Sequence, residues 1–434
     1  MAQIKAPRGT QDMLPANASK WEEVESTLLA TAKAYGFREI RTPVFESTEL
    51  FQRGVGDLTD VVQKEMYTFE DKGGRSITLR PEGTAGAVRA AVEHGLLNDA
   101  LPLKLCYLTS CYRYEKPQAG RLREFHQFGV ECLGTGEPIA DAQLILFARR
   151  IFDAFGLENI HLELNSIGCP HCRENYYNAL REYFSAHLET LCETCRGRLE
   201  KNPMRILDCK SPVCKEIAAQ APVILDYLCD ECREHFETVK GYLDAAEVPY
   251  TVNPRIVRGL DYYTKTVFEF ICDDIGAQGT VLGGGRYDGL VEELGGKSVP
   301  ALGFAMGLER LLMVLEAKQY AFEGDAAPAI YFCNIGQNAL RLSLSLCDEL
   351  LADGFAADLD LMGRSLKAQM KYANKIGALF TAVIGDDDIA GDCIKIKNMR
   401  TGEVYESNVA DFAENFENLV IQSTLFEGEV ENNG

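Results

Sequence analysis

The stretch from residue 103 to residue 131 constrains the fold of this chain most strongly. Its sequence, LKLCYLTSCYRYEKPQAGRLREFHQFGVE, predicts two strands joined by a polar, basic loop. Since side chains alternate between the faces of a strand, an antiparallel pair should gather one row of polar and aromatic groups: Thr109, Cys111, Arg113, Glu115, Phe125, Gln127, Gly129 and Glu131. Burying such groups without partners costs roughly 1–3 kcal/mol each, so we expect a ligand to cover this face. The alternative is a solvated amphipathic hairpin.

Length and composition indicate an ordinary globular protein. The 434 residues suffice for two or three domains, and no apolar run approaches the roughly 20 residues of a membrane helix. The beginning, MAQIKAPRGTQDMLP, has no apolar signal region, so we expect a cytoplasmic protein without a membrane anchor. A formal charge of −21 argues against extensive phosphate contacts, although a local basic surface can coexist with it.

Two other stretches place a charged side chain at the start of a predicted helix. In RPEGTAG, residues 80–86, Glu82 lies between a proline and a glycine and is well placed to bind an ammonium group. Thr84 in the same stretch has an alternative role as a helix cap. Arg310 lies in the first turn of a predicted helix, where the helix dipole disfavours a cation by about 0.3–1 kcal/mol. That position suggests a compensating anion, either a neighbouring carboxylate or a ligand.

These motifs resemble those of class II aminoacyl-tRNA synthetases, and specifically those of the histidyl-tRNA synthetase family. YRYE, the basic loop and REFHQFGVE resemble motif 2, and ALGFAMGLERLLMVLE resembles motif 3. VRGLDYY (257–263) and GGGRYDGL (283–290) resemble the two segments that distinguish the histidyl enzymes within that class. The resemblance implies an α+β catalytic domain with a central antiparallel sheet, residues 1–320. It also implies ATP-dependent attachment of L-histidine to histidine tRNA through a histidyl-adenylate intermediate, with release of AMP and pyrophosphate.

The same resemblance implies roles for individual residues. Histidine would be bound by Glu82, Gly83, Thr84, Gln127, Glu131, Arg258, Tyr262, Tyr263 and Tyr287. ATP, as its Mg²⁺ complex, would be bound by Arg113, Glu115, Phe125 and Arg310. Arg113 and Arg258 would be catalytic, on opposite sides of the α-phosphate. The acceptor end of the tRNA would meet the loop residues Gln118, Arg121 and Arg123. A helix over 19–35 and the strand after it resemble motif 1, which implies a homodimer.

Residues 169–232 contain eight of the fifteen cysteines in closely spaced pairs: Cys169 and Cys172, Cys192 and Cys195, Cys209 and Cys214, and Cys229 and Cys232. Such pairs indicate structural Zn²⁺, in one or two thiolate sites, because disulfides are rare in a reducing compartment. Buried structural cysteines and redox chemistry are the alternatives. We expect an inserted helical subdomain over residues 168–248. The family resemblance assigns no role to its cysteines.

Beyond a polar linker over 318–328, the pattern of predicted secondary structure changes. Residues 329–425 alternate predicted strands and helices, which indicates a parallel or mixed sheet covered by helices. This domain resembles the anticodon-binding domain of the histidyl enzymes, and one predicted helix carries a small basic patch: Arg364, Lys367, Lys371 and Lys375. The acidic end, residues 426–434, is predicted to be disordered.

Two other functions remain open at this point. The regulatory subunit of ATP phosphoribosyltransferase shares the synthetase fold and senses histidine. It usually lacks the C-terminal domain and parts of the motifs, both of which are present here. The second alternative is a zinc-dependent nucleic-acid-binding protein with a vestigial pocket.

Overall fold

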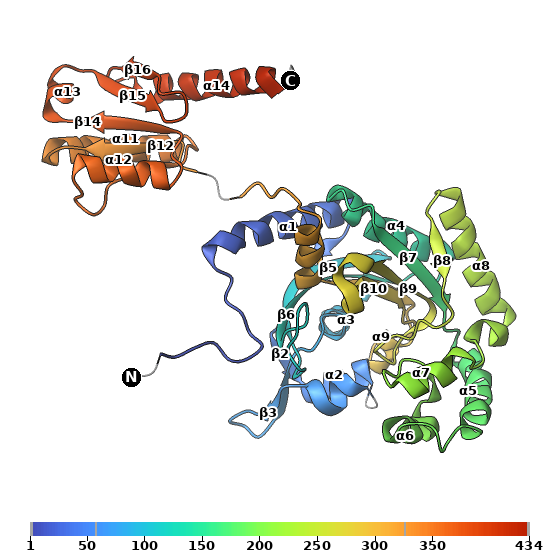
Figure 1. Ribbon diagram of the computed structural model, residues 1–434. Coiled ribbons are helices and arrows are strands. Elements are labelled where there is room, and N and C mark those ends of the chain that lie inside the picture. Colours follow the sequence, from blue (N-terminus) through green and yellow to red (C-terminus); the bar gives the residue numbers. More distant parts are fainter. Residues whose placement is uncertain (1–2, 57–58, 325–326, 432–434) are drawn as a thin grey trace. The chain divides into compact units, whose positions relative to one another are not determined.

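The computed structural model describes residues 3–56, 59–324 and 327–431 (Figure 1). The chain forms two compact units, residues 1–322 and 323–434, and the division between them falls inside the predicted linker. Within the described ranges, no helix combines the length and the apolar character that a bilayer crossing requires.

An eight-stranded sheet forms the centre of the first unit, in the order β1-β5-β6-β11-β10-β9-β7-β8. The edge pairs β1–β5 and β7–β8 run parallel and the other neighbours run antiparallel, which confirms the predicted sheet. The strands are β1 (Arg38–Glu39), β5 (Leu103–Tyr112), β6 (Glu124–Leu133), β7 (Ile160–Ser166), β8 (Tyr250–Val252), β9 (Thr264–Cys272), β10 (Thr280–Arg286) and β11 (Ala301–Gly307).

Helices pack on both faces of this sheet because successive strand residues point to opposite sides. Phe268 on one face belongs to a core cluster with side chains of four helices, α1 (Pro15–Ala34), α4 (Pro138–Ala154), α8 (Asp230–Ala245) and α10 (Leu308–Ala317). Its neighbour Val267 belongs to a different cluster on the opposite face, with side chains of α3 (Thr84–Glu93) and α9 (Leu290–Glu293). The polar row predicted from the sequence lies on this second face.

The hairpin β5–β6 pairs in a register that brings the two predicted sets of strand residues side by side. Cys111 lies opposite Phe125, Thr109 opposite Gln127, and Leu105 opposite Glu131. Strand β5 ends at Tyr112, so the predicted members Arg113 and Glu115 lie in the loop beyond the paired residues. This register brings the side chains of the two strands onto one surface, as the ligand-binding interpretation requires.

A small sheet with the order β2-β4-β3 lies beside the main one. Its strands are β2 (Phe45–Ser47), β3 (Thr68–Glu70) and β4 (Ser76–Leu79), and α2 (Thr48–Val55) follows the first of them. Pro43 separates β2 from β1, because proline cannot donate to a strand ladder. Phe45 and Phe69 on this sheet are about half exposed.

The cysteine-rich insertion is helical, as predicted. It contains α5 (Pro170–Ser185), α6 (Glu193–Lys201), α7 (Pro212–Ala219) and α8 (Asp230–Ala245). Cysteines and apolar residues between Cys172 and Cys232 form a separate core cluster. The second half of α8 instead packs into the main core through Phe236, Val239 and Leu243. The insertion therefore has its own small core and is joined to the catalytic sheet along α8.

The second unit contains a five-stranded mixed sheet in the order β13-β12-β14-β15-β16, which confirms the predicted α/β domain. Its strands are β12 (Ile330–Asn334), β13 (Ala357–Leu359), β14 (Phe380–Ile384), β15 (Ile394–Asn398) and β16 (Val404–Ser407). Its helices are α11 (Gln337–Ala352), α12 (Leu366–Lys375), α13 (Asp386–Ala390) and α14 (Phe412–Glu431).

The tail over 426–434, for which disorder is predicted, overlaps the end of the last helix of the second unit. Helix α14 continues through Glu431, and residues 432–434 lie outside the described residues. No proline interrupts this stretch, so the helical hydrogen bonds of the preceding turns can continue.

Candidate active site

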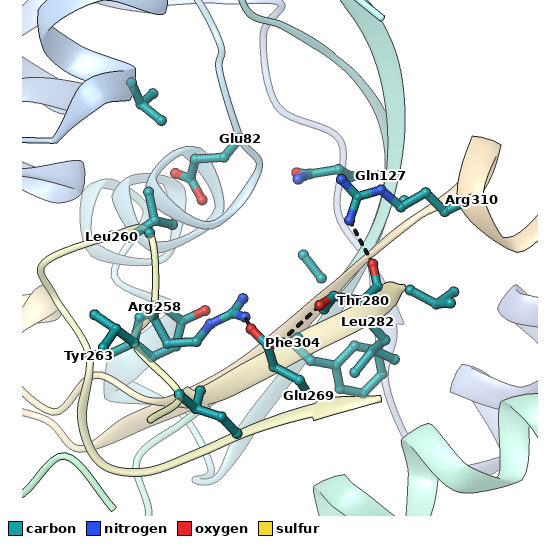
Figure 2. A pocket seen from close by; sticks show the side chains of 18 of the residues that line it. Glu82, Gln127, Arg258, Leu260, Tyr263, Glu269, Thr280, Leu282, Phe304 and Arg310 are labelled. Atoms are coloured by element: carbon teal, nitrogen blue, oxygen red, sulfur yellow. Dashed lines mark hydrogen bonds and ion pairs between the residues drawn. The ribbon is translucent and has the colours of Figure 1, made fainter. Parts of the chain in front are cut away.

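A cavity of about 570 Å³ opens over the second face of the main sheet. Figure 2 shows side chains from several elements pointing into this shared space: Glu82, Gln127, Arg258 and Arg310. The other predicted site residues that line it are Thr84, Arg113, Glu115, Arg121, Phe125, Tyr262, Tyr263 and Tyr287. The fold therefore brings together residues from β6 and the hairpin loop, from the β4–α3 junction, from the 253–263 loop and from α10.

Glu131 does not itself line the cavity; it is 1% exposed and contacts Tyr287, which does. Its carboxylate accepts a hydrogen bond from the Tyr107 hydroxyl at 2.9 Å and another from the Tyr287 hydroxyl. Burial raises the pKa of Glu131 to about 8, and the hydrogen bonds from the hydroxyl groups oppose that rise. The result is a buried carboxyl group surrounded by hydroxyl donors, suited to accept a hydrogen bond from a neutral or cationic ring.

Tyr107 is a site residue that the sequence analysis missed. Its ring fills the space above two glycines, since a Cβ added to Gly83 or Gly129 would lie 2.2 Å from ring atoms. The predicted histidine-binding residue Gly83 therefore makes room for Tyr107. The signal was present in the strand alternation, because Tyr107 shares a face with Thr109 and Cys111. A tyrosine in a strand is more often a core residue, which is why its position alone did not reveal it.

Glu82 combines burial with an interaction at the start of α3. Its two carboxylate oxygens accept the backbone N–H groups of Thr84 and Ala85, at 2.9 and 2.7 Å. The capping role considered for Thr84 thus belongs to Glu82. The carboxylate is 3% exposed, and burial raises its pKa. Thr84 contacts Tyr107 through the two hydroxyl oxygens, 3.3 Å apart, so both residues remain part of the same polar lining.

Arg258 reaches the cavity from the loop before β9. Its guanidinium lies 5.4 Å from the centre of the Tyr263 ring and is paired with Glu269, which also accepts the Thr280 hydroxyl at 3.0 Å. A Cβ at Gly283 would lie 2.5 Å from the guanidinium nitrogens, so this glycine leaves the space that the arginine occupies. The buried Nε atom of Arg258 has no hydrogen-bond partner among the described residues.

Arg113 lies on the hairpin side of the same cavity. Its Nε donates to the Pro81 carbonyl at 2.8 Å, which fixes the side chain while its guanidinium lies 5.3 Å from the Phe125 ring centre. Glu115 is paired with Arg121 at 3.0 Å. These contacts hold one cation and one aromatic face next to each other, a combination suited to a phosphate beside a nucleobase.

Arg310 projects from the first turn of α10 toward the same space. Its Nη1 donates to the Thr280 carbonyl at 2.6 Å, and its Nε lies 3.4 Å from the Gly120 carbonyl. Burial and the neighbouring Arg121 lower the pKa of Arg310. Two neighbouring cations repel each other, and an anion bound between them would relieve that repulsion.

The loop residues predicted to meet tRNA do not all face one cavity. Gln118 and Arg121 pair through their backbones, but Arg121 lines the main cavity whereas Gln118 lines a smaller one of about 260 Å³. Arg123 stacks over Tyr114, with its guanidinium 3.8 Å from the ring centre. Its backbone N–H donates to the Gly9 carbonyl at 2.7 Å.

Comparison with known proteins identifies the family. Residues 9–311 match the family model described as Histidyl-tRNA synthetase, and residues 329–419 match one described as Anticodon binding domain. A histidine–tRNA ligase of Caldanaerobacter subterraneus is 54% identical over 402 residues, which is 93% of this chain and 96% of that protein. The chain belongs to the histidyl-tRNA synthetase family. A histidine–tRNA ligase of Clostridium perfringens is also 54% identical, over 93% of this chain and 96% of the relative.

Solved structures agree with this membership. The apo histidyl-tRNA synthetase of S. aureus has a TM-score of 0.82 and 41% identity, covering 95% of this chain and all of the other. A Bacillus halodurans structure described as an ATP phosphoribosyltransferase regulatory subunit/histidyl-tRNA synthetase has a TM-score of 0.60 at 21% identity, covering 89% of this chain and 98% of the other. That second likeness shows the fold alone.

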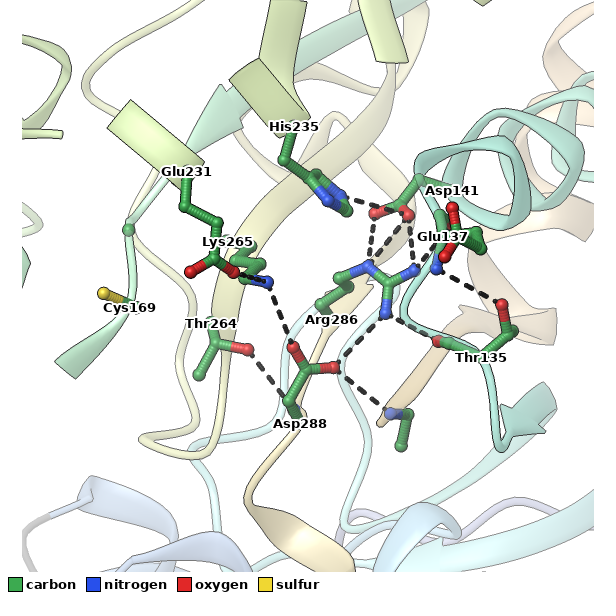
Figure 3. Close-up of polar contacts among 12 residues, drawn as sticks. Thr135, Glu137, Asp141, Cys169, Glu231, His235, Thr264, Lys265, Arg286 and Asp288 are labelled. Atoms are coloured by element: carbon green, nitrogen blue, oxygen red, sulfur yellow. Dashed lines mark hydrogen bonds and ion pairs between the residues drawn. The ribbon is translucent and has the colours of Figure 1, made fainter. Parts of the chain in front are cut away.

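The histidyl-family segment GGGRYDGL contributes more to the support of the site than to its surface. Arg286 is fully buried, and its guanidinium pairs with Asp141 at 2.7 Å and Asp288 at 3.2 Å (Figure 3). His235 of the insertion lies 3.3 Å from the same Asp141 carboxylate. The segment thus ties β10, α4 and α8 together behind the cavity, while the next residue, Tyr287, reaches Glu131.

The cysteines of the insertion form two groups, which histidyl-tRNA synthetase family membership does not explain. One contains Cys169, Cys172, Cys229 and Cys232, and the other contains Cys192, Cys195, Cys209 and Cys214. Within each group all Sγ atoms lie within 4.8 Å of one another. Tetrahedral zinc with Zn–S distances of about 2.3 Å requires sulfur atoms about 3.8 Å apart, so both groups fit that ion.

Backbone N–H groups also point at these sulfur atoms. The N–H of Cys229 lies 3.1 Å from the Cys172 sulfur, and the N–H of Cys192 lies 3.3 Å from the Cys214 sulfur. Donors of this kind stabilise the negative charge of thiolate ligands. The sequence analysis predicted one or two sites without the pairing, and the fold joins the first cysteine pair with the last and the second with the third.

Proposed function

We propose that this chain, as a histidine–tRNA ligase, activates L-histidine with ATP and transfers it to histidine tRNA through a histidyl-adenylate intermediate. The observation that supports this most directly is the position of Arg113 and Arg258, which line one cavity from different elements. The histidine carboxylate would attack the α-phosphorus of ATP, pyrophosphate would leave, and a ribose hydroxyl of the terminal adenosine would then take the histidyl group.

The two arginines would supply the charge stabilisation that phosphoryl transfer needs. Such transfers depend on positioning and electrostatics more than on covalent chemistry by the protein. Arg113, fixed by the Pro81 carbonyl, would hold the α-phosphate from the hairpin side. Arg258 would face it across the substrate, and its unpartnered Nε offers a donor for that purpose. Mg²⁺ bound to the outer phosphates would neutralise part of their charge.

Histidine would lie with its ring toward Glu131. Glu131 and Tyr263 would bond the opposite nitrogens of the imidazole, and Tyr107 would orient the carboxyl group through its own hydrogen bond. The ammonium group would be surrounded by Glu82, Thr84, Gln127 and Tyr287, with Tyr262 closing the pocket beside Tyr263. A buried site built for two ring nitrogens rejects analogues that lack them by roughly four to five orders of magnitude.

The nucleotide would lie between the hairpin and α10. Adenine would stack between Phe125 and Arg310, with Glu115 near its amino group. The loop with Gln118, Arg121 and Arg123 would meet the acceptor end of the tRNA. In the second unit, the patch formed by Arg364, Lys367, Lys371 and Lys375 would contribute to anticodon recognition.

A single-turnover assay without tRNA tests the intermediate. Incubation of the enzyme with labelled histidine, ATP and Mg²⁺ should yield about one histidyl adenylate per active site, retained by the protein on gel filtration. Chasing this complex with unlabelled histidine and histidine tRNA should move the label to the tRNA. Labelled tRNA formed without prior accumulation of an enzyme-bound adenylate would contradict the two-step route.

We further propose that the insertion holds two structural zinc ions, one in each cysteine group. None of the eight cysteines lines the main cavity, although the two residues adjacent to Cys209 do. The metal would therefore stabilise the fold and take no part in catalysis. A subdomain this small has a limited apolar core, and a four-thiolate zinc site contributes folding free energy directly. Metal analysis of the reduced protein should find two zinc ions per chain.

Removing the metal provides the second measurement. A chelator should accelerate amide hydrogen exchange within 168–248 first, while the hairpin β5–β6 stays protected. Metal-free protein with eight freely titrating thiols and an unchanged exchange pattern would leave these cysteines as packing residues.

We also propose a cytoplasmic homodimer. The support is the exposed apolar surface on and beside the small sheet, where Val44, Phe45 and Phe69 are between 42% and 55% exposed. Exposed apolar patches of this kind mark interfaces. Light scattering during gel filtration should give twice the mass of 48.1 kDa for one chain. A single-chain mass at micromolar concentration would contradict the dimer.

A further inference from the structure

We propose that Arg205 is a positioning residue that holds the 256–263 segment in the conformation that binds histidine. Through this residue the metal-binding insertion would set the affinity of the active site for its amino acid. The inference rests on the proposed function, because the segment carries Arg258, Tyr262 and Tyr263, to which that function assigns the substrate.

The contact between Arg205 and the segment is direct. The Arg205 Nη2 atom donates to the Gly259 carbonyl at 2.9 Å and to Asp261 Oδ1 at 2.8 Å. Asn202 donates to the same oxygen at 3.3 Å. The Arg205 side chain is only 14% exposed, so this ion pair is shielded from solvent to a degree that most surface pairs are not. Arg205 therefore contacts the residues on either side of Leu260: the backbone of Gly259, which follows Arg258, and the side chain of Asp261, which precedes Tyr262.

The segment needs such support because no strand ladder holds it. It lies between β8 and β9 and is irregular from residue 253 to residue 263. On its other side, the Asp261 N–H donates to the Val55 carbonyl at 3.2 Å, and a Cβ at Gly56 would lie 2.9 Å from the Asp261 carboxylate. Asp261 is therefore clamped between the end of α2 and Arg205 of the insertion.

Arg205 lies in the part of the insertion that contains the second cysteine group. It lies between Cys195 and Cys209, and the Arg198 side chain donates to its carbonyl at 3.0 Å. Arg198 also pairs with Asp60 at 3.1 Å, which attaches the same part of the insertion to the catalytic unit. A metal bound by this group would restrict the whole segment between the two cysteines.

The residues that flank Cys209 reach the substrate cavity as well. Asp208 and Lys210 both line it, although neither belongs to any motif of the family that the sequence analysis considered. A ligand cysteine of the second group therefore lies between two lining residues of the active-site cavity. This is an independent indication that order in the insertion is transmitted to the site.

The first cysteine group holds the end of the segment. Arg173, next to Cys172, donates to the Tyr263 carbonyl at 3.1 Å. Lys265, two residues beyond Tyr263, pairs at 2.9 Å with Glu231, the neighbour of Cys232 (Figure 3). Both cysteine groups thus place a residue on the histidine-binding segment, and Arg205, supported by Asn202, contacts its centre. A purely structural insertion does not require contacts directed at this one segment.

Arg205→Ala tests the inference in the full-length, zinc-loaded enzyme. In pyrophosphate exchange the KM for histidine should rise at least about fivefold, while the KM for ATP stays within about twofold. Amide exchange over 256–263 should become faster, and the zinc content should equal that of the unmodified protein. Arg181→Ala is the matched control, because Arg181 lies on α5 of the insertion and contacts only insertion residues. It should change none of these quantities.

Asp261→Asn provides the second variant, since it weakens the same contact from the other partner. It should raise the KM for histidine in the same direction, and combining it with Arg205→Ala should add little. An unchanged KM for histidine and unchanged amide exchange over 256–263 in Arg205→Ala would overturn the inference. An unmodified enzyme that shows no histidine-dependent exchange would instead overturn the proposed function, so the two failures are distinguishable.

Metal removal tests the connection to the cysteines. Chelation of zinc from the unmodified enzyme should raise the KM for histidine, whereas chelation of the Arg205→Ala enzyme should raise it little further. Equal increases in both enzymes would show that the metal acts on the site by a route other than Arg205.

Discussion

The hydroxyl of Tyr107 donates a hydrogen bond to Glu131 at 2.9 Å, and both residues are buried. This contact joins neighbouring strands of the hairpin. Gly83 and Gly129 leave the space that the tyrosine ring occupies. Amino-acid recognition in this account depends on that arrangement, because the carboxyl group is oriented before any substrate enters.

Glu131→Gln should raise the KM for histidine by roughly 10- to 100-fold, because a ring N–H loses the carboxyl group that accepts its hydrogen bond. Steady-state pyrophosphate exchange at saturating ATP measures this change. Glu124→Gln is the matched control, since Glu124 starts the same strand, bonds Tyr112 and does not line the main cavity. Equal KM values for histidine in Glu131→Gln and in the unmodified enzyme would place the ring elsewhere.

The raised pKa of Glu131 predicts a pH dependence of stability in the absence of substrate. The pKa is about 8 in the folded chain against an ordinary value of 4.5, so between these values the folded state binds more protons than the unfolded state. Stability should therefore fall as the pH rises from about 4.5 to 8. Urea unfolding across this range should show a shallower fall for Glu131→Gln, and identical slopes would contradict the shift.

Arg258→Ala should reduce the rate of adenylate formation by roughly 10²- to 10³-fold, with a smaller effect on histidine binding. Rapid-quench measurement of the first turnover separates this step from product release. Arg258→Lys should recover only part of the rate, because an ammonium group cannot reproduce the fork of the guanidinium. A first turnover as fast as that of the unmodified enzyme would exclude Arg258 from the reaction.

Truncation after Phe322 should leave histidine-dependent pyrophosphate exchange largely intact and weaken tRNA charging, because the first unit contains the whole cavity. Charging by the full chain should also weaken as salt rises, since tRNA contacts release counterions. The two activities are measured on the same preparation. Full charging by the truncated enzyme would remove the second unit from tRNA recognition.

Much of the fold was predictable because its signals are local. The shared face of Thr109, Cys111, Phe125 and Gln127 follows from strand alternation, and the fold adds the register that pairs them. The strands and helices of the second unit follow from their apolar periodicity. The end of α14 was not predicted from the acidic composition of the last residues. Such a composition indicates disorder only where the preceding residues do not form a helix that can continue.

The site residues were predictable where they belong to a sequence motif. Their interactions were less predictable where tertiary contacts determine them. The cap formed by Glu82 depends on the geometry of the β4–α3 junction, which spacing alone does not give. The cysteines that group with Cys169 could not be assigned from the sequence either, because the start of α5 approaches the start of α8 only in the folded insertion. The contact from Arg205 to Asp261 joins residues 56 positions apart and has no sequence signature.

Exchange of labelled pyrophosphate into ATP tests the central claim most directly. With enzyme, Mg²⁺, ATP and labelled pyrophosphate, the addition of L-histidine alone should start rapid incorporation of the label into ATP, without tRNA. Other amino acids and histidine analogues that lack a ring nitrogen should support little exchange. A histidine-sensing regulatory subunit or a nucleic-acid-binding protein would bind its ligand without exchange, so no histidine-dependent label in ATP would contradict this account.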